Sequence, residues 1–337
     1  MGSRGRCWGR ARACPRAQRS DRSRPLESGS PLAPPPLRRP SDRGWSPPFG
    51  APRSRPDPSG ISKPIYEPWL RTAKSLGCPF YAFAYDWYRD NLETVEKLAA
   101  AIAAIRERHG GGPVQLVAHS MGGLVSLALL NRQPDAFVHV LFGGIPLRGG
   151  VGFSEEMHVG LPTGRNQRVS DPHMLFTCPS IYTLYPLGRL DCFAPDGSAL
   201  DLDFFNPGSW VEHGIGIFAD PGEATPEHLE FLGWALGRAR TFREQLIHRK
   251  DAAYPPITVV ASHGFPTLAT AMRHGPKSVR GWDLKSMPRR PGDQRVCPEH
   301  ALPPDGFEYE RVENALEHGA ILEDPRIPEL LTPHARG

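Results

Sequence analysis

A serine between small residues, at the end of a short apolar run, constrains this chain more than any other feature. Residues 114–118 predict a buried strand, and the apolar residues 122–131 predict a helix directly after it. Ser120 lies at the bend, and Ala118 and Gly122 flank it where larger side chains would collide. Such a sharp strand-to-helix turn projects a serine hydroxyl above the sheet, so Ser120 is the candidate nucleophile.

The alternative for Ser120 is a serine that only caps the following helix, which is the usual role of a Ser-x-Gly sequence. Here strand, turn, the pair Gly122-Gly123 and helix occur together in the order that a nucleophile requires. The helix also points its free N–H groups at the serine, where they stabilise a developing negative charge. The Met121 N–H is the expected first donor to that oxyanion.

The pattern around this bend predicts alternating strands and helices from residue 61 onward. The expected elements are a helix at 64–76, a buried strand at 80–85, a helix at 92–105, strands at 138–142 and 257–261, a helix at 226–248, a strand at 307–312 and a helix from 325. This order predicts a mostly parallel sheet with helices on both faces, and the serine turn makes it an α/β-hydrolase fold. Residues 146–255 interrupt the rhythm and are expected to form an inserted cap, and 262–305 are expected to be mostly loop.

Residues 1–60 are an Arg- and Pro-rich leader without strand or helix periodicity. They hold 13 arginines and 4 acidic residues, a net charge of +9, whereas the remaining residues carry a net charge of −5. We expect the leader to be a disordered, solvated tail rather than a targeting peptide, because it has too little apolar surface to offset the entropy of ordering. Because its net charge is negative, the folded domain at 61–337 is not expected to bind nucleic acid. A module that binds RNA or a membrane through the leader is the functional alternative that we rank last.

Targeting and cofactor signals are missing from the printed sequence. The leader's arginines are not followed by an apolar core, and no run of eighteen apolar residues occurs. The six cysteines lack metal-ligand spacing and are expected to be free thiols, and there is no nucleotide motif. We therefore expect a cytoplasmic protein that needs no metal or other cofactor.

The acid and the base of a serine triad follow the nucleophile in this fold, in the order serine, acid, histidine. His318 fits the base because it comes after the last predicted strand, and its rival His300 precedes that strand. Asp293 lies on a turn between the cap and His318. Spacing leaves Asp283 and Asp305 open as alternative acids, since aspartate is common in turns.

Aromatic residues and one histidine are the candidates for substrate contact. Tyr85 and Trp87 end the predicted strand beside the site, His119 precedes the nucleophile, and Trp210 lies in the cap. The cap aromatics are expected to line an acyl pocket, with ordinary core packing as the alternative for each of them. These cap residues are Phe193, Phe204, Phe205, Trp210 and Phe218.

An ordered set of motifs resembles the lecithin–cholesterol acyltransferase family over about residues 61–330. The motifs are Tyr85-Asp86-Trp87, Ala118-His119-Ser120-Met121-Gly122-Gly123, Gly143-Gly144-Ile145-Pro146, Tyr182-Thr183-Leu184-Tyr185-Pro186, Gly292-Asp293 followed by Val296, and His318. The resemblance implies that Ser120, Asp293 and His318 are the triad. It also implies ester or acyl-transfer chemistry on lipids, such as phospholipid deacylation with transfer to an alcohol or to water, and transient contact with a lipid surface.

Two departures from that family's pattern bear on activity. Gln294 stands where the family has the second glycine of Gly-Asp-Gly. In that family, a first strand ends in a glycine-containing loop that supplies the second oxyanion N–H. No such strand or loop is found before Pro64, so the sheet is expected to lack an early strand. Losing one oxyanion donor costs about 10²–10³ in turnover. The alternatives are therefore a catalytically impaired member that binds lipid or a partner, and a related serine esterase or thioesterase.

Overall fold

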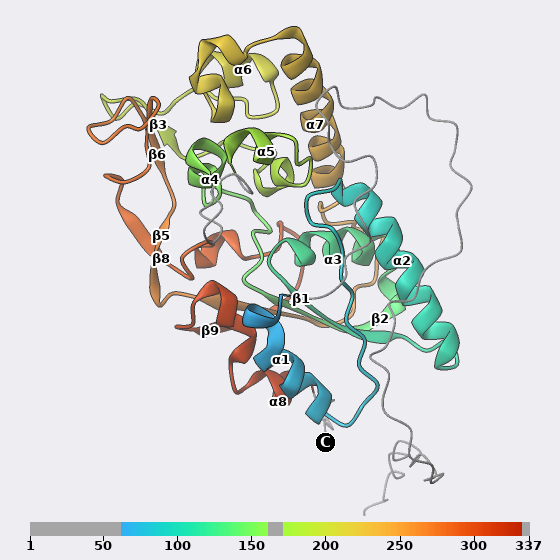
Figure 1. Ribbon diagram of the computed structural model, residues 1–337. Coiled ribbons are helices and arrows are strands. Elements are labelled where there is room, and N and C mark those ends of the chain that lie inside the picture. The colour runs from blue at the N-terminus through green and yellow to red at the C-terminus, as the bar shows by residue number, and fades with distance from the viewer. Residues whose placement is uncertain (1–61, 161–170, 332–337) are drawn as a thin grey trace, which may run out of the picture. The chain divides into compact units, whose positions relative to one another are not determined.

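The computed structural model describes residues 62–160 and 171–331 of the 337-residue chain, so the predicted leader at 1–60 lies outside the described residues. A four-stranded sheet forms the centre of the described part (Figure 1). Its strands, all parallel, follow the order β1-β2-β4-β9. They are β1 (Val114–His119), β2 (Phe137–Gly143), β4 (Ile257–Ser262) and β9 (Glu310–Asn314).

Helices cover both faces of this sheet (Figure 1). Strand β2 shows why, because its side chains point alternately to the two faces. Val140 and Phe142 pack in one hydrophobic cluster with α2 (Asn91–Arg108) and α3 (Met121–Arg132). Leu141 packs in the opposite cluster, against α1 and α8. The predicted parallel sheet between two helical layers is confirmed.

Local signals explain where the flanking helices begin. The Asp90 side chain accepts a hydrogen bond from the Leu92 N–H and caps α2, which runs on to Arg108. On the other face lie α1 (Lys63–Ser75) and α8 (Ile327–Leu331), with the 3-10 helix η6 (His318–Glu323) between β9 and α8. Because α1 packs on η6, the first described helix reaches the end of the chain that carries His318.

The segment between β2 and β4, proposed as a cap, contains most of the short elements. Its helices and those loops after β4 that pack on it share a second core, in which Tyr182 and Trp210 are completely buried. The helices are α4 (Ser154–Val159), α5 (Pro172–Phe176), α6 (Pro207–Glu212) and α7 (Pro226–Glu244), with 3-10 turns η2 (Ile181–Leu184), η3 (Gly216–Ala219) and η4 (Pro221–Glu223). The remaining 3-10 turns are η1 (Pro134–Ala136) and η5 (Pro298–His300).

Short strands interrupt the region predicted to be mostly loop, although most of its residues lie in turns and loops as predicted. Strands β5 (Phe265–Leu268) and β8 (Arg289–Gly292) form an antiparallel pair. Strands β3 (Cys192–Phe193), β6 (Ala271–Arg273) and β7 (Trp282–Asp283) form a small sheet that joins this region to the cap. These strands have two to four residues each, too few to show a period of two in the sequence.

The prediction of a buried strand at 80–85 was wrong. The segment makes no strand pairing, and the side chains of Tyr81 and Phe83 are each 36% exposed. Segment 80–85 forms no strand because the sheet ends at β1. Among the described residues, β1 has β2 on one side and no strand on the other. Without an adjacent strand the backbone of 80–85 has no ladder to join, as expected for a sheet that lacks an early strand.

None of the helices in the described ranges is long and apolar enough to cross a membrane.

Candidate active site

The bend at Ser120 has the strained backbone that its neighbours predict. Ser120 follows β1 with φ +52° and ψ −135°, a conformation that costs a residue with a side chain about 1–3 kcal/mol. Its N–H donates to the Gly143 carbonyl at 3.2 Å, which ties the bend to the end of β2. A Cβ on Gly123 would lie 1.8 Å from the Ile145 side chain, so the second glycine after the serine is required by packing.

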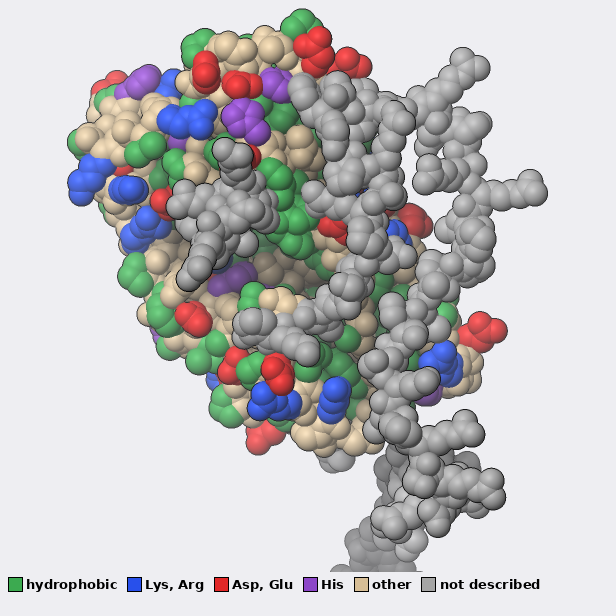
Figure 2. Space-filling model, in the orientation of Figure 1, with side chains coloured by type: hydrophobic (Ala, Val, Ile, Leu, Met, Phe, Trp, Pro, Cys, Tyr) green, Lys and Arg blue, Asp and Glu red, His purple; other side chains and the backbone are tan. Residues whose placement is uncertain are grey.

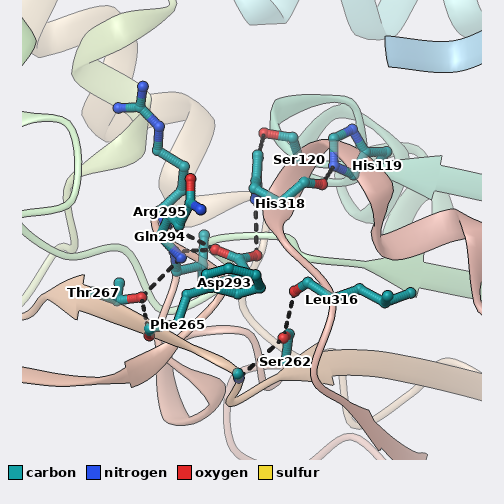
Figure 3. A network of polar contacts seen from close by, with 12 residues as sticks. His119, Ser120, Ser262, Phe265, Thr267, Asp293, Gln294, Arg295, Leu316 and His318 are labelled. Carbon is teal, nitrogen blue, oxygen red and sulfur yellow. Dashed lines mark hydrogen bonds and ion pairs between the residues drawn. The ribbon is translucent and has the colours of Figure 1, made fainter.

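Three residues from distant parts of the chain meet at this bend (Figure 3). His318 Nε2 lies 2.9 Å from the Ser120 hydroxyl, and His318 Nδ1 lies 2.8 Å from Asp293 Oδ2. Ser120 follows β1, Asp293 follows β8, and His318 begins η6. The structure thus places the three predicted triad residues in the order and at the distances that nucleophilic catalysis requires.

The Asp293 carboxylate is fully engaged by hydrogen-bond donors. Its Oδ1 accepts the N–H groups of Arg295 at 2.8 Å and Val296 at 2.7 Å, which leaves Oδ2 for His318. The main chains are joined as well, because the His318 N–H donates to the Asp293 carbonyl at 2.9 Å. The Asp293 side chain is only 1% exposed, and these protein donors take the place of water around it.

Gln294 explains one departure noted in the sequence. Its φ is +84°, in the left-handed region that favours glycine, which is the residue that the motif usually has there. The Gln294 N–H donates to Thr267 Oγ1 at 2.9 Å, so β5 holds the turn despite the strain. The Asp293 loop therefore keeps its geometry with a residue other than glycine.

A recess lies in the face of the molecule shown in Figure 2, with histidine at its floor and hydrophobic side chains around it. Ser120 is partly exposed, and the His318 side chain is 18% exposed. The candidate nucleophile Ser120 and the candidate base His318 are therefore within reach of solvent, while Asp293 is buried.

Comparison with known proteins bears on the fold that carries these residues. Residues 87–145, fewer than a fifth of the 337, match the family model of the S33 serine aminopeptidases. A chain of the Tle4–Tli4 complex superposes with a TM-score of 0.52 at 15% identity, over 72% of this chain and 65% of that one. The match thus spans just under two thirds of that chain.

The chain has an α/β-hydrolase fold.

A monoacylglycerol lipase from Paleococcus ferrophilus matches with a TM-score of 0.36 at 13% identity, over 79% of this chain and 84% of that one. No curated protein matches the sequence.

The rival residues lie elsewhere in this α/β-hydrolase fold. His300 packs against Gly150, and its main chain bonds to Arg148. The carboxylate of Asp283 accepts three backbone N–H groups of its own loop, and Asp305 pairs with the Arg148 guanidinium at 2.7 Å. None of the three is hydrogen-bonded to His318 or Ser120, so the structure separates the alternatives that spacing left open.

His119 was expected to contact substrate, but both of its ring nitrogens have protein partners. Nε2 lies 2.8 Å from the main-chain carbonyl of His318, and Nδ1 lies 2.9 Å from the Tyr66 hydroxyl. A carbonyl only accepts, so Nε2 carries the hydrogen and Nδ1 accepts from Tyr66. His119 therefore supports the backbone of His318 rather than presenting a free nitrogen to a ligand. Tyr66 had no signal in the sequence, because 53 residues separate it from His119.

The pKa of His119 gives a pH-dependent prediction. Burial and the neighbouring His318 lower this pKa from 6.5 to about 3. Below pH 6.5 the unfolded chain binds a proton at this residue and the folded chain does not, so stability falls with pH between about 6.5 and 3. We expect the wild type to lose about 2 kcal/mol more than His119→Gln between pH 6.5 and 5, measured by urea unfolding. Equal losses in the two proteins would contradict this assignment.

Gly144 lies directly under the acid–base pair. A Cβ at this position would come within 2.9 Å of Asp293 Oδ2 and 3.3 Å of His318 Nδ1, and its φ of +59° disfavours alanine. We expect Gly144→Ala to lower the free energy of unfolding by about 1–3 kcal/mol and turnover by at least about 10-fold. Gly237→Ala is the matched control, because a Cβ there meets nothing within 4 Å. Wild-type turnover in Gly144→Ala would show that the pair tolerates displacement.

Most of the predicted substrate-contacting aromatics turn out to pack the cap. Trp210 is completely buried, and its Nε1–H donates to the Phe204 carbonyl at 2.7 Å, so its assignment to substrate contact was wrong. Trp87 is half-buried, with its ring 3.9 Å from that of Tyr88 and against the same core. Phe204, Phe205 and Phe218 are each at most 8% exposed, and Phe193 is half-buried.

A small cavity of about 30 Å³ lies between the cap and the loops after β4, and Phe204 borders it. None of Ser120, Asp293 and His318 lines this cavity. It is therefore separate from the candidate triad, and the location of an acyl pocket stays a prediction.

Proposed function

We propose that this protein is a serine-dependent lipase or acyltransferase that cleaves lipid acyl esters through an acyl-enzyme on Ser120. The observation that carries the proposal is the continuous chain of hydrogen bonds from the Ser120 hydroxyl through His318 to Asp293, at 2.9 and 2.8 Å. A strained serine at a helix N-terminus, bonded to an imidazole that a buried carboxylate orients, is the arrangement used for acyl transfer.

The geometry sets the direction of proton transfer. Asp293 accepts from His318 Nδ1–H, so Nε2 keeps its lone pair and faces Ser120 Oγ. Nε2 takes the hydroxyl proton as Oγ attacks the ester carbonyl carbon, and the carbonyl electrons move onto oxygen. The carbonyl re-forms as the alkoxide leaves, and the imidazolium returns the proton to the alkoxide. Water or an alcohol, deprotonated in turn by Nε2, then attacks the acyl carbonyl carbon. The bond to Ser120 Oγ breaks, and the imidazolium returns the proton to Oγ.

The oxyanion formed in each step requires donors at the start of α3. The first N–H groups of a helix have no partner within the helix, and Met121 is its first residue. The Met121 N–H therefore remains our candidate for the first oxyanion donor.

Lipid specificity rests on the sequence motifs and on the surface. The ordered motifs resemble the lecithin–cholesterol acyltransferase family, and hydrophobic side chains are among those that border the recess (Figure 2). Such side chains suit a substrate whose acyl chain must leave a lipid layer, and transient contact with that layer is part of the proposal.

The test uses phosphatidylcholine vesicles that contain a labelled long-chain alcohol. Free fatty acid and acylated alcohol are measured with the wild type and with Ser120→Ala, and p-nitrophenyl butyrate and an acyl thioester are assayed in parallel. We expect serine-dependent deacylation of the phospholipid. Turnover of the short ester or the thioester alone would replace the lipid substrate by the esterase or thioesterase alternative.

A second candidate is a catalytically impaired α/β-hydrolase that binds lipid or a partner. The observation in its favour is that no strand lies beside β1 on the oxyanion side within the described residues, so the loop expected there is missing from them. This candidate predicts that the protein floats with vesicles while a fluorophosphonate probe does not label Ser120. Labelling of Ser120 in the folded protein would exclude it.

A further inference from the structure

Tyr85 ends the unpaired segment 80–85 at the nucleophile. Its hydroxyl oxygen lies 3.7 Å from the position that a Cβ on Gly122 would occupy. Gly122 is the second residue of α3, immediately after Met121 and two residues after Ser120. The hydroxyl therefore lies next to the first turn of the helix that begins at Met121.

The Tyr85 hydroxyl has no hydrogen-bond partner among the described residues, whereas the nearby Tyr66 hydroxyl donates to His119. Burial, with a smaller contribution from Tyr66, raises the pKa of Tyr85 above its ordinary value of 10. The hydroxyl therefore keeps its proton at any pH at which such an enzyme works, and it remains an uncommitted donor.

The arrangement of the sheet limits where a second oxyanion donor can come from. On one side of β1 lie β2, β4 and β9, and the loops beyond these strands bring Asp293 and His318 to the serine. A donor that completes the oxyanion site must come from the opposite side of β1, which no described strand occupies. Segment 80–85, which joins α1 to α2 (Figure 1), places the Tyr85 hydroxyl next to the start of α3.

We propose that Tyr85 is a catalytic residue whose hydroxyl donates the second hydrogen bond to the oxyanion. This inference rests on the proposed function. As Ser120 Oγ bonds to the carbonyl carbon, the electron pair of the C=O bond moves onto oxygen, and the Met121 N–H and the Tyr85 O–H donate to it. Tyr85 keeps its proton throughout, and the electrons return when the leaving group departs. The tyrosine thus supplies what a backbone N–H of the missing loop would supply.

Tyr85→Phe tests the proposal, because it removes the hydroxyl and keeps the ring that stacks on Phe83. With p-nitrophenyl esters we expect kcat to fall about 10²–10³-fold and KM to change by less than about 2-fold, since the hydrogen bond strengthens only in the transition state. Tyr81→Phe is the control: it removes a hydroxyl from the same segment, but that hydroxyl bonds to the exposed His109. Its kinetics should match those of the wild type.

A trifluoromethyl ketone separates a catalytic role from a structural one. The serine hydroxyl adds to its carbonyl carbon and forms a tetrahedral adduct that carries an oxyanion. Because the adduct resembles the transition state, the inhibition constant should rise in Tyr85→Phe by about the factor lost in kcat. An unchanged melting temperature verifies that the variant folds. The proposal is overturned by a kcat within about 2-fold of the wild type, or by loss of kcat without weaker inhibition. Equal rates for the wild type and Ser120→Ala would instead refute the proposed function itself.

Discussion

Alanine at position 120 is expected to lower the turnover of acyl esters by about 10⁴- to 10⁶-fold. The hydroxyl is the only group at the bend that His318 Nε2 contacts by hydrogen bonding, at 2.9 Å, so its removal leaves no nucleophile for the acyl-enzyme. The residual rate comes from water attacking a substrate that is still bound and polarised at the start of α3. Turnover of p-nitrophenyl esters and labelling by a fluorophosphonate measure the two consequences separately.

Stability provides the control for Ser120→Ala. The positive φ of Ser120 remains in the variant, so the free energy of unfolding should change little relative to the loss of activity. Ser75→Ala, at the exposed C-terminal end of α1, should keep wild-type turnover. An active Ser120→Ala, or fluorophosphonate labelling at another serine, would remove Ser120 from the mechanism.

Asparagine at position 293 is expected to lower kcat by about 10⁴-fold with little change in fold. Oδ1 of Asp293 accepts two N–H groups, from Arg295 and Val296, so the amide oxygen of asparagine must occupy that position. Its NH₂ group then faces His318 Nδ1, which becomes the acceptor, and the ring proton moves to Nε2. A protonated Nε2 points a hydrogen at Ser120 Oγ and cannot take its proton.

Imidazole NMR spectra show which ring nitrogen of His318 carries the hydrogen, and kcat measures the consequence for catalysis. The Asp293→Asn spectrum should show the hydrogen on Nε2, and kcat should fall while KM stays close to the wild-type value. Asp305→Asn is the control, because Asp305 pairs with Arg148 at the surface. A kcat in Asp293→Asn near the wild-type value would show that another group orients His318.

Local features of the sequence predicted the strained bend at Ser120 well. The bend needs a strand, a small residue on either side of Ser120 and a helix, and all of these lie within about twenty consecutive residues. The parallel sheet followed from the alternation of strands and helices in the same way, because each element carries its own periodicity. Asp293 was harder to select, since a turn aspartate looks the same whether or not a histidine lies beside it.

Long-range contacts account for the errors. His119 was grouped with substrate-contacting residues because nothing near it in the chain indicates that Tyr66 and the His318 carbonyl bind its ring. Segment 80–85 has the composition of a buried strand, but a strand requires a neighbour, and none of the described strands borders it. Trp210 is apolar and aromatic in either role, and only its environment distinguishes a cap core from a substrate pocket.

By itself the sequence determined the strained serine turn, the α/β architecture and the small set of histidines and aspartates from which a triad could be drawn. The tertiary structure decided which members of that set meet: 198 residues separate Ser120 from His318, and β1, β2, β4 and β9 must form the sheet before those side chains come within 2.9 Å. It also placed the Tyr85 hydroxyl beside the start of α3. Hydrogen bonds and close packing act over a few ångströms in space, so residues far apart in the chain reveal them only once it has folded.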